Sequence, residues 1–178
     1  DFEVILVDNL SSDQTVEIAK RHHVDKIINI EEFLPGKAIN DGIRSSNGKY
    51  IVCLSAHCLP KDEHWLSNLK SNFGKGHNIA GVYGRQLPLN FTDPIDKRDL
   101  MTVFGLDQKI QIKDYFFHNA NSMIRRDIWE KFPFDEQVTN IEDRVWGKAV
   151  VKAGYRLAYD PQAAVFHYHG INQKNNAE

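Results

Sequence analysis

Short apolar runs alternate with segments of helical apolar spacing along the first half of the chain. The apolar runs lie at residues 2–8, 26–30, 50–54 and 79–83. Runs of this length that are apolar almost throughout are typical of strands buried in a parallel sheet. The intervening segments predict helices at 12–22, 37–46 and 65–73. Strand, helix and strand at this spacing predict right-handed crossover units, so we expect the first three strands to share one parallel sheet in an open α/β fold.

The second half of the chain is less regular. Residues 87–114 contain two prolines and many charges, and they predict one helix near 97–104. Such a segment is either a lid over a ligand site or an ordinary surface loop. Beyond it we predict strands at 121–125, 156–159 and 164–167 and helices at 127–131 and 141–152, the last with Asn140 as its N-cap. We expect a single domain over residues 1–170 and a polar tail over 171–178.

Composition narrows the classes of function. The 178 residues carry a formal net charge of -2 and no basic stripe, which argues against binding to a nucleic-acid backbone. Cys53 lies inside an apolar strand and Cys58 just past its end, a poor geometry for a disulfide, so we expect a reducing compartment. No apolar run approaches the roughly 18 residues of a membrane span, and no signal peptide is present. The chain begins without Met, directly in a predicted strand, so we expect it to be part of a longer protein.

Polar residues follow the first and third predicted strands. Open α/β sheets bind ligands at the carboxyl ends of their strands, so we expect Asp8 and the segment Ser55-Ala56-His57 to project towards a crevice. Asp8 either accepts a hydrogen bond from a nucleobase or caps the following turn. His57 either binds a divalent metal ion or forms an ordinary hydrogen bond in a loop.

A second histidine group lies at the end of the last predicted strand, where His167 and His169 flank Tyr168. We expect only one of this pair, His167, to join His57. Two histidines and one carboxylate make a chemically sensible site for a first-row metal ion.

Two adjacent carboxylates, Glu142 and Asp143, lie in the first turn of the helix predicted at 141–152. The helix dipole favours carboxylates there, so a structural role is one interpretation and a catalytic role is the other. Arg85 follows the strand at 79–83 and either neutralises a diphosphate or pairs with a surface carboxylate.

Small polar side chains at residues 119–122 either contact sugar hydroxyls or form the polar start of a strand. Trp65, Trp129 and Trp146 lie at helical positions among apolar neighbours. We expect all three to pack in the core.

The order and spacing of these motifs resemble a family 2 glycosyltransferase of the GT-A fold over residues 3–169. The matching segments are VILVDNLSSDQT at 4–15, GKAINDGI at 36–43, GKYI at 48–51, the acidic pair, GYR at 154–156 and AVFH at 164–167. Residues 84–88, 119–122 and 124–126 look most like the rhamnosyltransferase-like branch. The resemblance implies a Rossmann-like open mixed α/β sheet flanked by helices.

The resemblance also implies roles for individual residues. Asp143 matches the aspartate that is the usual general base, and Glu142 would orient a neighbouring group. Asp8 would contact the nucleobase of a nucleoside-diphosphate sugar. Arg85 would contact a phosphate or the acceptor.

Two features depart from the family pattern. The metal-binding Asp-x-Asp motif falls on Ser55-Ala56-His57, where both aspartates are absent. Some GT-A enzymes use an acidic-x-His version with a later histidine, so the resemblance permits His57 and His167 as ligands of Mn²⁺ or Mg²⁺, with Ser55 and Ala56 beside the donor. The family's first strand would precede Asp1, so we expect an N-terminally truncated fold that binds its donor poorly.

We therefore expect an inverting glycosyltransferase of bacterial type that acts in cell-surface polysaccharide synthesis. It would move a sugar from a nucleoside diphosphate to a hydroxyl of a glycan or lipid-linked acceptor. Its expected location is the cytoplasm, with peripheral contact to the membrane through a partner or a missing segment.

Two alternatives stay open. One is a non-catalytic GT-A module that has lost its metal site, which would bind neither metal nor donor. The other is a nucleotidyltransferase, although no Gly-rich basic phosphate loop is visible.

Overall fold

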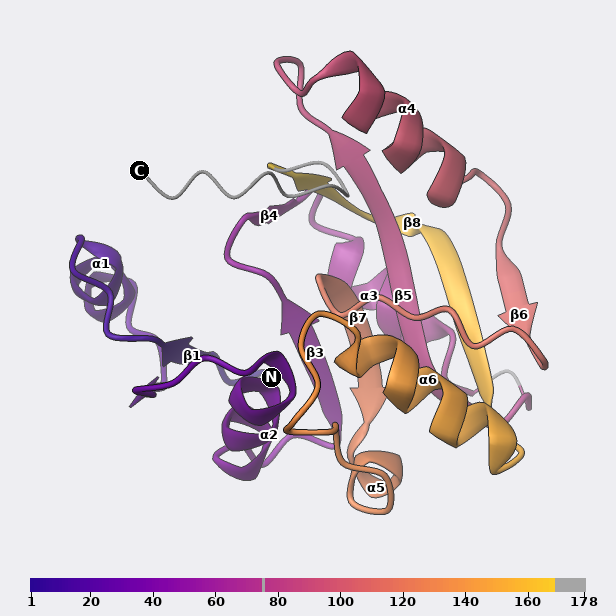
Figure 1. Ribbon diagram of the computed structural model, residues 1–178, viewed down its shortest axis with the longest axis horizontal. Helices are drawn as coiled ribbons and strands as arrows, with labels where there is room; N and C mark the ends of the chain where they lie inside the picture. Colours follow the sequence, from indigo (N-terminus) through magenta and orange to yellow (C-terminus); the bar gives the residue numbers. More distant parts are fainter. Residues whose placement is uncertain (75, 169–178) are drawn as a thin grey trace.

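Two sheets of unequal size form the centre of the computed structural model, which describes residues 1–74 and 76–168 (Figure 1). The strands are β1 (Ile5–Asp8), β2 (Lys26–Asn29), β3 (Tyr50–Leu54), β4 (Cys58–Pro60), β5 (Ile79–Pro88), β6 (Lys109–Gln111), β7 (Asn121–Arg125) and β8 (Arg156–His167). The helices are α1 (Thr15–Arg21), α2 (Pro35–Arg44), α3 (Trp65–Ser71), α4 (Pro94–Val103), α5 (Arg126–Trp129) and α6 (Glu142–Lys152). An open α/β sheet flanked by helices confirms the predicted fold class.

The larger sheet is mixed, with strand order β3-β7-β5-β8-β4 and with β6 paired to β8. β5 and β8 are parallel, whereas β7 runs antiparallel to both β3 and β5. Strands β3, β5 and β8 therefore run the same way, and their carboxyl ends at Leu54, Pro88 and His167 lie on one edge of the sheet. This is the kind of edge at which open α/β sheets bind ligands.

The smaller sheet contains β1 and β2, which pair in parallel. The prediction that the first three strands share one parallel sheet is therefore wrong, because β3 pairs along its whole length with β7 and with no other described strand. Helix α2 connects the two parts, since Gly42 lies against Val7 of β1 while Ile43 belongs to the core of the larger sheet. Figure 1 shows β1 and α1 to one side of the larger sheet, beyond β3.

A separate hydrophobic cluster covers each face of the larger sheet. Neighbouring residues of one strand belong to different clusters, as Val82 and Tyr83 of β5 do, because successive side chains of a strand point to opposite faces. The cluster around Tyr83 lies under α2, α4, α5 and α6, and the cluster around Val82 lies under α3. The expected core positions of the tryptophans are confirmed: Trp129 and Trp146 belong to the first cluster, and Trp65 packs against the second.

The segment at residues 87–114 is anchored to the larger sheet. Its helix α4 begins at Pro94, a little before the predicted start, because the Asp93 side chain caps it by accepting a hydrogen bond from the Ile95 N–H at 2.8 Å. Leu100 and Phe104 are fully buried against the sheet. A lid function for this segment stays a prediction.

Strand pairing departs from the prediction in the last part of the chain. The strands predicted at 156–159 and 164–167 are two halves of one strand, β8, whose register with β5 shifts between Gly84 and Gln86. The short strands β4 and β6, which the sequence did not predict, both pair with β8. The predicted polar tail at 171–178 and His169 lie outside the described residues.

Candidate functional site

The two carboxylates predicted at the start of α6 lie beside the loop that leads into β7. The Asn119 side-chain amide donates to Glu142 Oε1 at 3.3 Å, and the Asn119 backbone N–H donates to Asp143 Oδ2 at 3.3 Å. We call Glu142, Asp143 and Asn119 the acidic corner. Neither carboxylate forms a salt bridge with a described residue. The acidic corner is therefore held by neutral hydrogen-bond donors.

Asn140 does not cap α6, so that prediction is wrong. Its backbone adopts a left-handed conformation with φ 62°, whereas an N-cap residue of the ordinary kind is extended. Ile141 occupies the N-cap position and provides no side-chain hydrogen bond. The Asp143 carboxylate instead accepts from a backbone N–H of the first turn, that of Arg144, at 2.7 Å.

Burial raises the pKa of both carboxyls. For Glu142, which is 7% exposed, loss of hydration is the largest cause, and repulsion by Asp143 adds to it. For Asp143, loss of hydration outweighs the hydrogen bonds from Arg144 and Asn119, which lower the pKa. A carboxylate with a raised pKa is a stronger base than an ordinary one, which suits it to accept a proton.

Helix α2 holds the segment that precedes the acidic corner. A Cβ atom at Gly36 would lie 2.0 Å from the carbonyl oxygen of Asp135 and 3.5 Å from the Cβ of Glu142, so only glycine allows this close approach. The fully buried Asn40 donates to the Phe134 carbonyl at 2.9 Å and accepts from the Phe134 N–H at 3.2 Å. These contacts fix the chain before α6, and sequence analysis did not single out either residue.

His118 is a further residue that sequence analysis missed. Burial, together with the positive charge of Arg144, lowers its pKa to about 4, so the imidazole is neutral at physiological pH. Its Nδ1 accepts from the Ala120 N–H at 3.3 Å, which places the ring proton on Nε2. This contact shapes the loop that carries Asn119.

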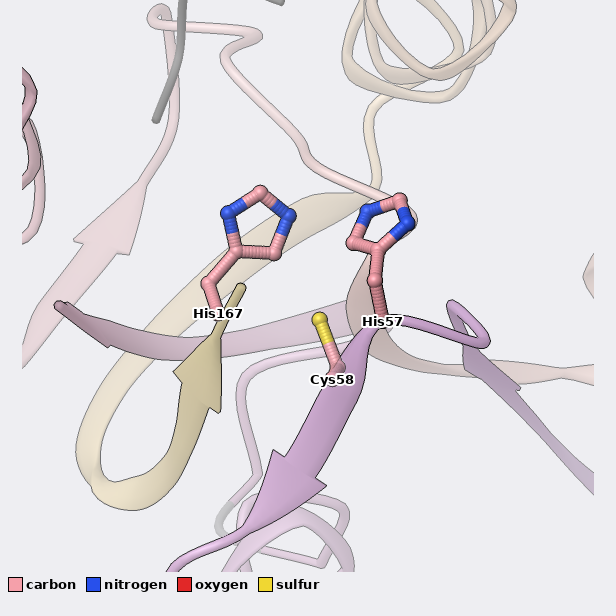
Figure 2. A group of neighbouring side chains, drawn as sticks. All are labelled: His57, Cys58 and His167. Carbon is pink, nitrogen blue, oxygen red and sulfur yellow. The ribbon is translucent and has the colours of Figure 1, made fainter. Parts of the chain in front are cut away.

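A second group of side chains lies where β4 pairs with the end of β8 (Figure 2). Cys58 is the direct cross-strand partner of His167, and His57 precedes Cys58 in the chain. One ligand atom from each of the three residues lies within 4.8 Å of the others, and the two imidazole centroids are 4.7 Å apart. Figure 2 shows all three side chains on the same side of the strands, with the sulfur directed towards the space between the rings. We call these residues the histidine–cysteine cluster.

The structure thus brings together the two predicted metal ligands, His57 and His167, and adds Cys58 to them. The sequence alone suggests no role for Cys58 beyond an unfavourable disulfide with Cys53. The pairing of β4 with β8 places Cys58 opposite His167, and without a prediction of β4 that pairing could not be inferred.

The donor atoms of the histidine–cysteine cluster suit some metal ions and not others. Among the described residues no carboxylate joins the group, whereas Mg²⁺ and Mn²⁺ favour carboxylate, carbonyl and water oxygens. Imidazole and thiolate ligands suit Zn²⁺ and related first-row ions. Burial raises the pKa of the Cys58 thiol to about 12, and a bound cation would oppose that shift because a thiol coordinates as its thiolate.

Ser55 and Ala56 lie between β3 and the cluster. Ser55 Oγ is 3.0 Å from Nε2 of His57, a contact of the kind that orients metal-binding imidazoles. The Ser55 backbone N–H donates to the Ala120 carbonyl at 3.0 Å, one residue from Asn119 of the acidic corner. The segment that carries Ala120 and Asn119 therefore connects the two groups, and Ala56 is exposed beside them.

Asp8 and Arg85 have partners inside the protein. The Asp8 carboxylate, buried at the end of β1, accepts from the Ser11 N–H at 3.0 Å and from the Ser11 hydroxyl. This confirms the turn-capping interpretation, and the nucleobase contact stays a prediction. Arg85 Nε donates to the Phe104 carbonyl at 3.2 Å, and Arg85 forms no salt bridge with a described residue.

The buried Asn121 serves the fold. Its amide donates to the Ala163 carbonyl at 2.8 Å and accepts from the Trp65 indole at 2.8 Å. For this residue the interpretation as a polar strand start is confirmed. In the described part of the chain, no helix combines the length and the apolar character that a membrane crossing requires.

Curated relatives of the chain are glycosyltransferases. The O-antigen chain rhamnosyltransferase WbaN of Salmonella anatum is 28% identical over 184 residues, which cover 97% of this chain and 58% of that protein. A poly-beta-1,6-N-acetyl-D-glucosamine synthase of Staphylococcus epidermidis is 26% identical, over 76% of this chain and 40% of that protein. The chain spans about half the length of the curated relatives it matches.

Solved structures share the fold. The mannosyltransferase PcManGT from Pyrobaculum calidifontis, in complex with GDP-Man and Mn²⁺, superimposes with a TM-score of 0.73 at 20% identity, over 97% of this chain and 49% of that chain. TarS of S. aureus in complex with UDP-GlcNAc gives a TM-score of 0.68 at 15% identity, over 99% and 52% of the two chains. The model of the family described as Glycosyl transferase family 2 matches residues 1–132, which is most of the chain. The chain therefore belongs to glycosyl transferase family 2.

Proposed function

We propose that the protein transfers a sugar from a nucleoside diphosphate to a hydroxyl of a glycan or lipid-linked acceptor, with inversion at the anomeric carbon. The observation that carries this proposal is the acidic corner, where Asp143 has a raised pKa, forms no salt bridge with a described residue and is held by the Asn119 backbone N–H. A structural carboxylate at a helix start would gain more from a lowered pKa, because capping bonds favour the charged form.

Asp143 acts as the general base in this mechanism. It takes the proton of the acceptor hydroxyl as that oxygen attacks the anomeric carbon, and the bond to the diphosphate oxygen breaks with its electron pair. This step is worth about 10²–10⁴ in rate. Glu142 orients Asn119 through its hydrogen bond of 3.3 Å, so it positions the acidic corner.

Donor contacts come from the end of β1 in the smaller sheet and from the edge of the larger sheet that carries the histidine–cysteine cluster. Asp8 contacts the nucleobase, while Ser55 and Ala56 line the diphosphate. Arg85 reaches a phosphate or the acceptor through its terminal nitrogens, since its Nε already donates to Phe104. His57 and His167 would hold a divalent ion, which would supply positive charge against the diphosphate leaving group.

The relatives support this assignment of substrate class. Relatives named as O-antigen rhamnosyltransferase and polysaccharide synthase, and solved structures with GDP-Man and UDP-GlcNAc, all point to nucleotide-sugar chemistry. We infer a role in cell-surface polysaccharide synthesis, at the cytoplasmic face of the membrane.

The alternative is a non-catalytic GT-A module. The observation in its favour is the replacement of the Asp-x-Asp motif by Ser55-Ala56-His57, which removes both carboxylates from the expected metal site. Metal and donor binding separate this alternative from the enzyme.

The test is calorimetric titration of UDP, dTDP, GDP and CDP into the protein, with and without a divalent metal ion. The expected result is tight, metal-dependent binding of one nucleotide that weakens in His57→Ala, followed by sugar transfer from the corresponding donor. His64→Ala is the matched control, because His64 is an exposed histidine outside the cluster. Failure of all four nucleotides to bind under either condition would favour the non-catalytic module.

A further inference from the structure

The histidine–cysteine cluster differs chemically from a carboxylate metal site. It offers two imidazoles and one thiol within 4.8 Å, and no described carboxylate joins them. A thiolate is a soft ligand, and thiolate with imidazole selects Zn²⁺ and similar ions over the hard cations Mg²⁺ and Mn²⁺. The metal preference of this site should therefore depend on Cys58.

We propose that His57, Cys58 and His167 form a three-ligand Zn²⁺ site in which the Cys58 thiolate replaces the carboxylates of a hard-cation site. Binding of Zn²⁺ by these three residues does not depend on the proposed function. The role of the ion in binding the donor does rest on it. Three protein ligands leave the fourth position of a tetrahedral ion open, as in catalytic zinc sites. That position takes a phosphate oxygen of the nucleoside-diphosphate donor.

The surroundings of the cluster support a built site. Cys58 and His167 are held opposite each other by the antiparallel pairing of β4 and β8, so their relative position is fixed by backbone hydrogen bonds. The Tyr168 N–H donates to the His57 carbonyl at 2.9 Å, which ties the third ligand to the same strand end. Ser55 Oγ contacts the His57 ring at 3.0 Å and orients it.

Two cysteines allow a matched experiment. Cys53 and Cys58 are both free, half-buried cysteines, and they differ in their place in the fold. Cys53 lies in β3 opposite Ser122 and is not part of the cluster. Cys53→Ser is therefore the control for Cys58→Ser.

The first measurement is metal binding to protein freed of metal by a chelator. Zn²⁺ affinity is measured by competition with a chromogenic chelator, and Co²⁺ serves as a spectroscopic probe of the ligands. We expect the wild type and Cys53→Ser to show a thiolate-to-cobalt charge-transfer band that Zn²⁺ abolishes. Cys58→Ser should lack the band and bind Zn²⁺ more than about 100-fold more weakly, because loss of a direct ligand exceeds the 10–100-fold effect of an outer-shell change.

The second measurement tests ion selectivity. Most sites bind Zn²⁺ more tightly than Mn²⁺ whatever their ligands. A preference for Zn²⁺ in the wild type is therefore not diagnostic, and the ratio of Zn²⁺ to Mn²⁺ affinity must be compared between the wild type and its variants. Cys58→Asp exchanges a soft ligand for a hard one and should lower the ratio of Zn²⁺ to Mn²⁺ affinity by at least about tenfold. Unchanged Zn²⁺ affinity in Cys58→Ser, or no Zn²⁺ binding by the wild type, overturns the proposal.

These outcomes are separate from the test of the transferase. The circular dichroism spectrum and thermal midpoint of each variant show whether it folds, so loss of metal binding can be told from loss of structure. A wild type that transfers sugar, together with a Cys58→Ser variant whose Zn²⁺ affinity is unchanged, would overturn the zinc site and leave the proposed function standing. A wild type that binds Zn²⁺ through Cys58 but binds no nucleotide would overturn the proposed function and leave the zinc site standing.

Discussion

The acidic corner and the histidine–cysteine cluster belong to the same edge of the larger sheet, but different kinds of interaction build them. The carboxylates of the acidic corner are neighbours in sequence at the start of α6, and a loop residue, Asn119, completes it. The cluster instead combines His57 and Cys58 with His167, which lies more than a hundred residues away and reaches them through strand pairing. A shift in strand register would separate the members of the cluster, whereas the two carboxylates stay side by side because they are neighbours on one helix.

The two groups also differ in the charge that they carry. Burial raises the pKa of Glu142 and Asp143, so ionisation of these carboxyls lowers the free energy of unfolding. The cluster brings its ligands together without any described carboxylate and gains its charge only when a cation binds. Variants that damage one group and spare the other will test whether the two are independent.

The largest expected effect separates the two groups by chemistry. Asp143→Asn should lower the rate of sugar transfer by about 10²–10⁴, because the amide cannot accept the acceptor proton. Its Zn²⁺ affinity should match that of the wild type. Steady-state transfer assays and metal competition check this, with Asp107→Asn, an exposed carboxylate, as the control. Full transfer activity in Asp143→Asn would remove it as the base.

A strand variant should damage the cluster most. Asn121→Ala leaves the buried Ala163 carbonyl and the Trp65 indole N–H without the partners that they have in the wild type. At about 1–3 kcal/mol for each unsatisfied group, the free energy of unfolding should fall by about 3 kcal/mol. Zn²⁺ binding should weaken as well, because Ala163 belongs to the register change in β8. Urea unfolding measures the first effect, and Asn68→Ala, which loses one exposed hydrogen bond, is the control.

A helix variant should damage the acidic corner instead. Asn40→Ala removes hydrogen bonds to both backbone groups of Phe134, to the Trp129 indole N–H and to Glu136. The free energy of unfolding should fall by about 3 kcal/mol, because buried polar groups lose their partners. Transfer activity should fall because the chain before α6 loses its anchor, while Zn²⁺ affinity stays the same. An equal loss of metal binding would show that the two groups are coupled through the fold.

The smallest effect is a dependence on pH. The pKa values of Glu142 and Asp143 lie above the ordinary 4.5 and 3.8, so the folded protein binds these protons more tightly than the unfolded chain. Their contribution to stability is therefore greatest below those ordinary values and is lost as the pH rises through the raised pKa values. Transfer should change in the opposite sense, increasing with pH as Asp143 ionises. Glu142→Gln with Asp143→Asn should flatten the stability profile, and an unchanged profile would contradict the raised pKa values.

The sequence predicted those features that depend on neighbours along the chain. The apolar runs located β1, β2, β3 and the start of β5, and the spacing from 141 to 152 located α6 with its acidic pair. It failed where pairing between distant segments decides the structure. Nothing in residues 58–60 distinguishes a strand until β8 is present beside them, so Cys58 was not recognised as a neighbour of His167.

The same limit explains the error in the first three strands. Apolar runs show that a strand is buried, but they do not show which strand lies beside it. β3 pairs with β7, which follows it by some seventy residues, and β1 pairs only with β2 among the described strands. The polar supports of the acidic corner were equally hidden, because Asn40 and Gly36 acquire their roles only when residues 134 and 135 fold against α2.

The register change between β5 and β8 sets how far along the larger sheet His167 lies. Four positions separate Gly84 from Pro88 on β5, whereas seven separate Asp160 from His167 on β8. In an unbroken register Pro88 would lie opposite Ala164, and His167 would fall beyond the end of β5. Gly84 permits the change, since a Cβ there would lie 1.9 Å from the Ala163 carbonyl oxygen. A deletion within residues 161–164 would therefore move His167 along the sheet, although every ligand would still be present in the sequence. A comparison of homologues by ligand identity alone would then misjudge which of them can hold a metal ion.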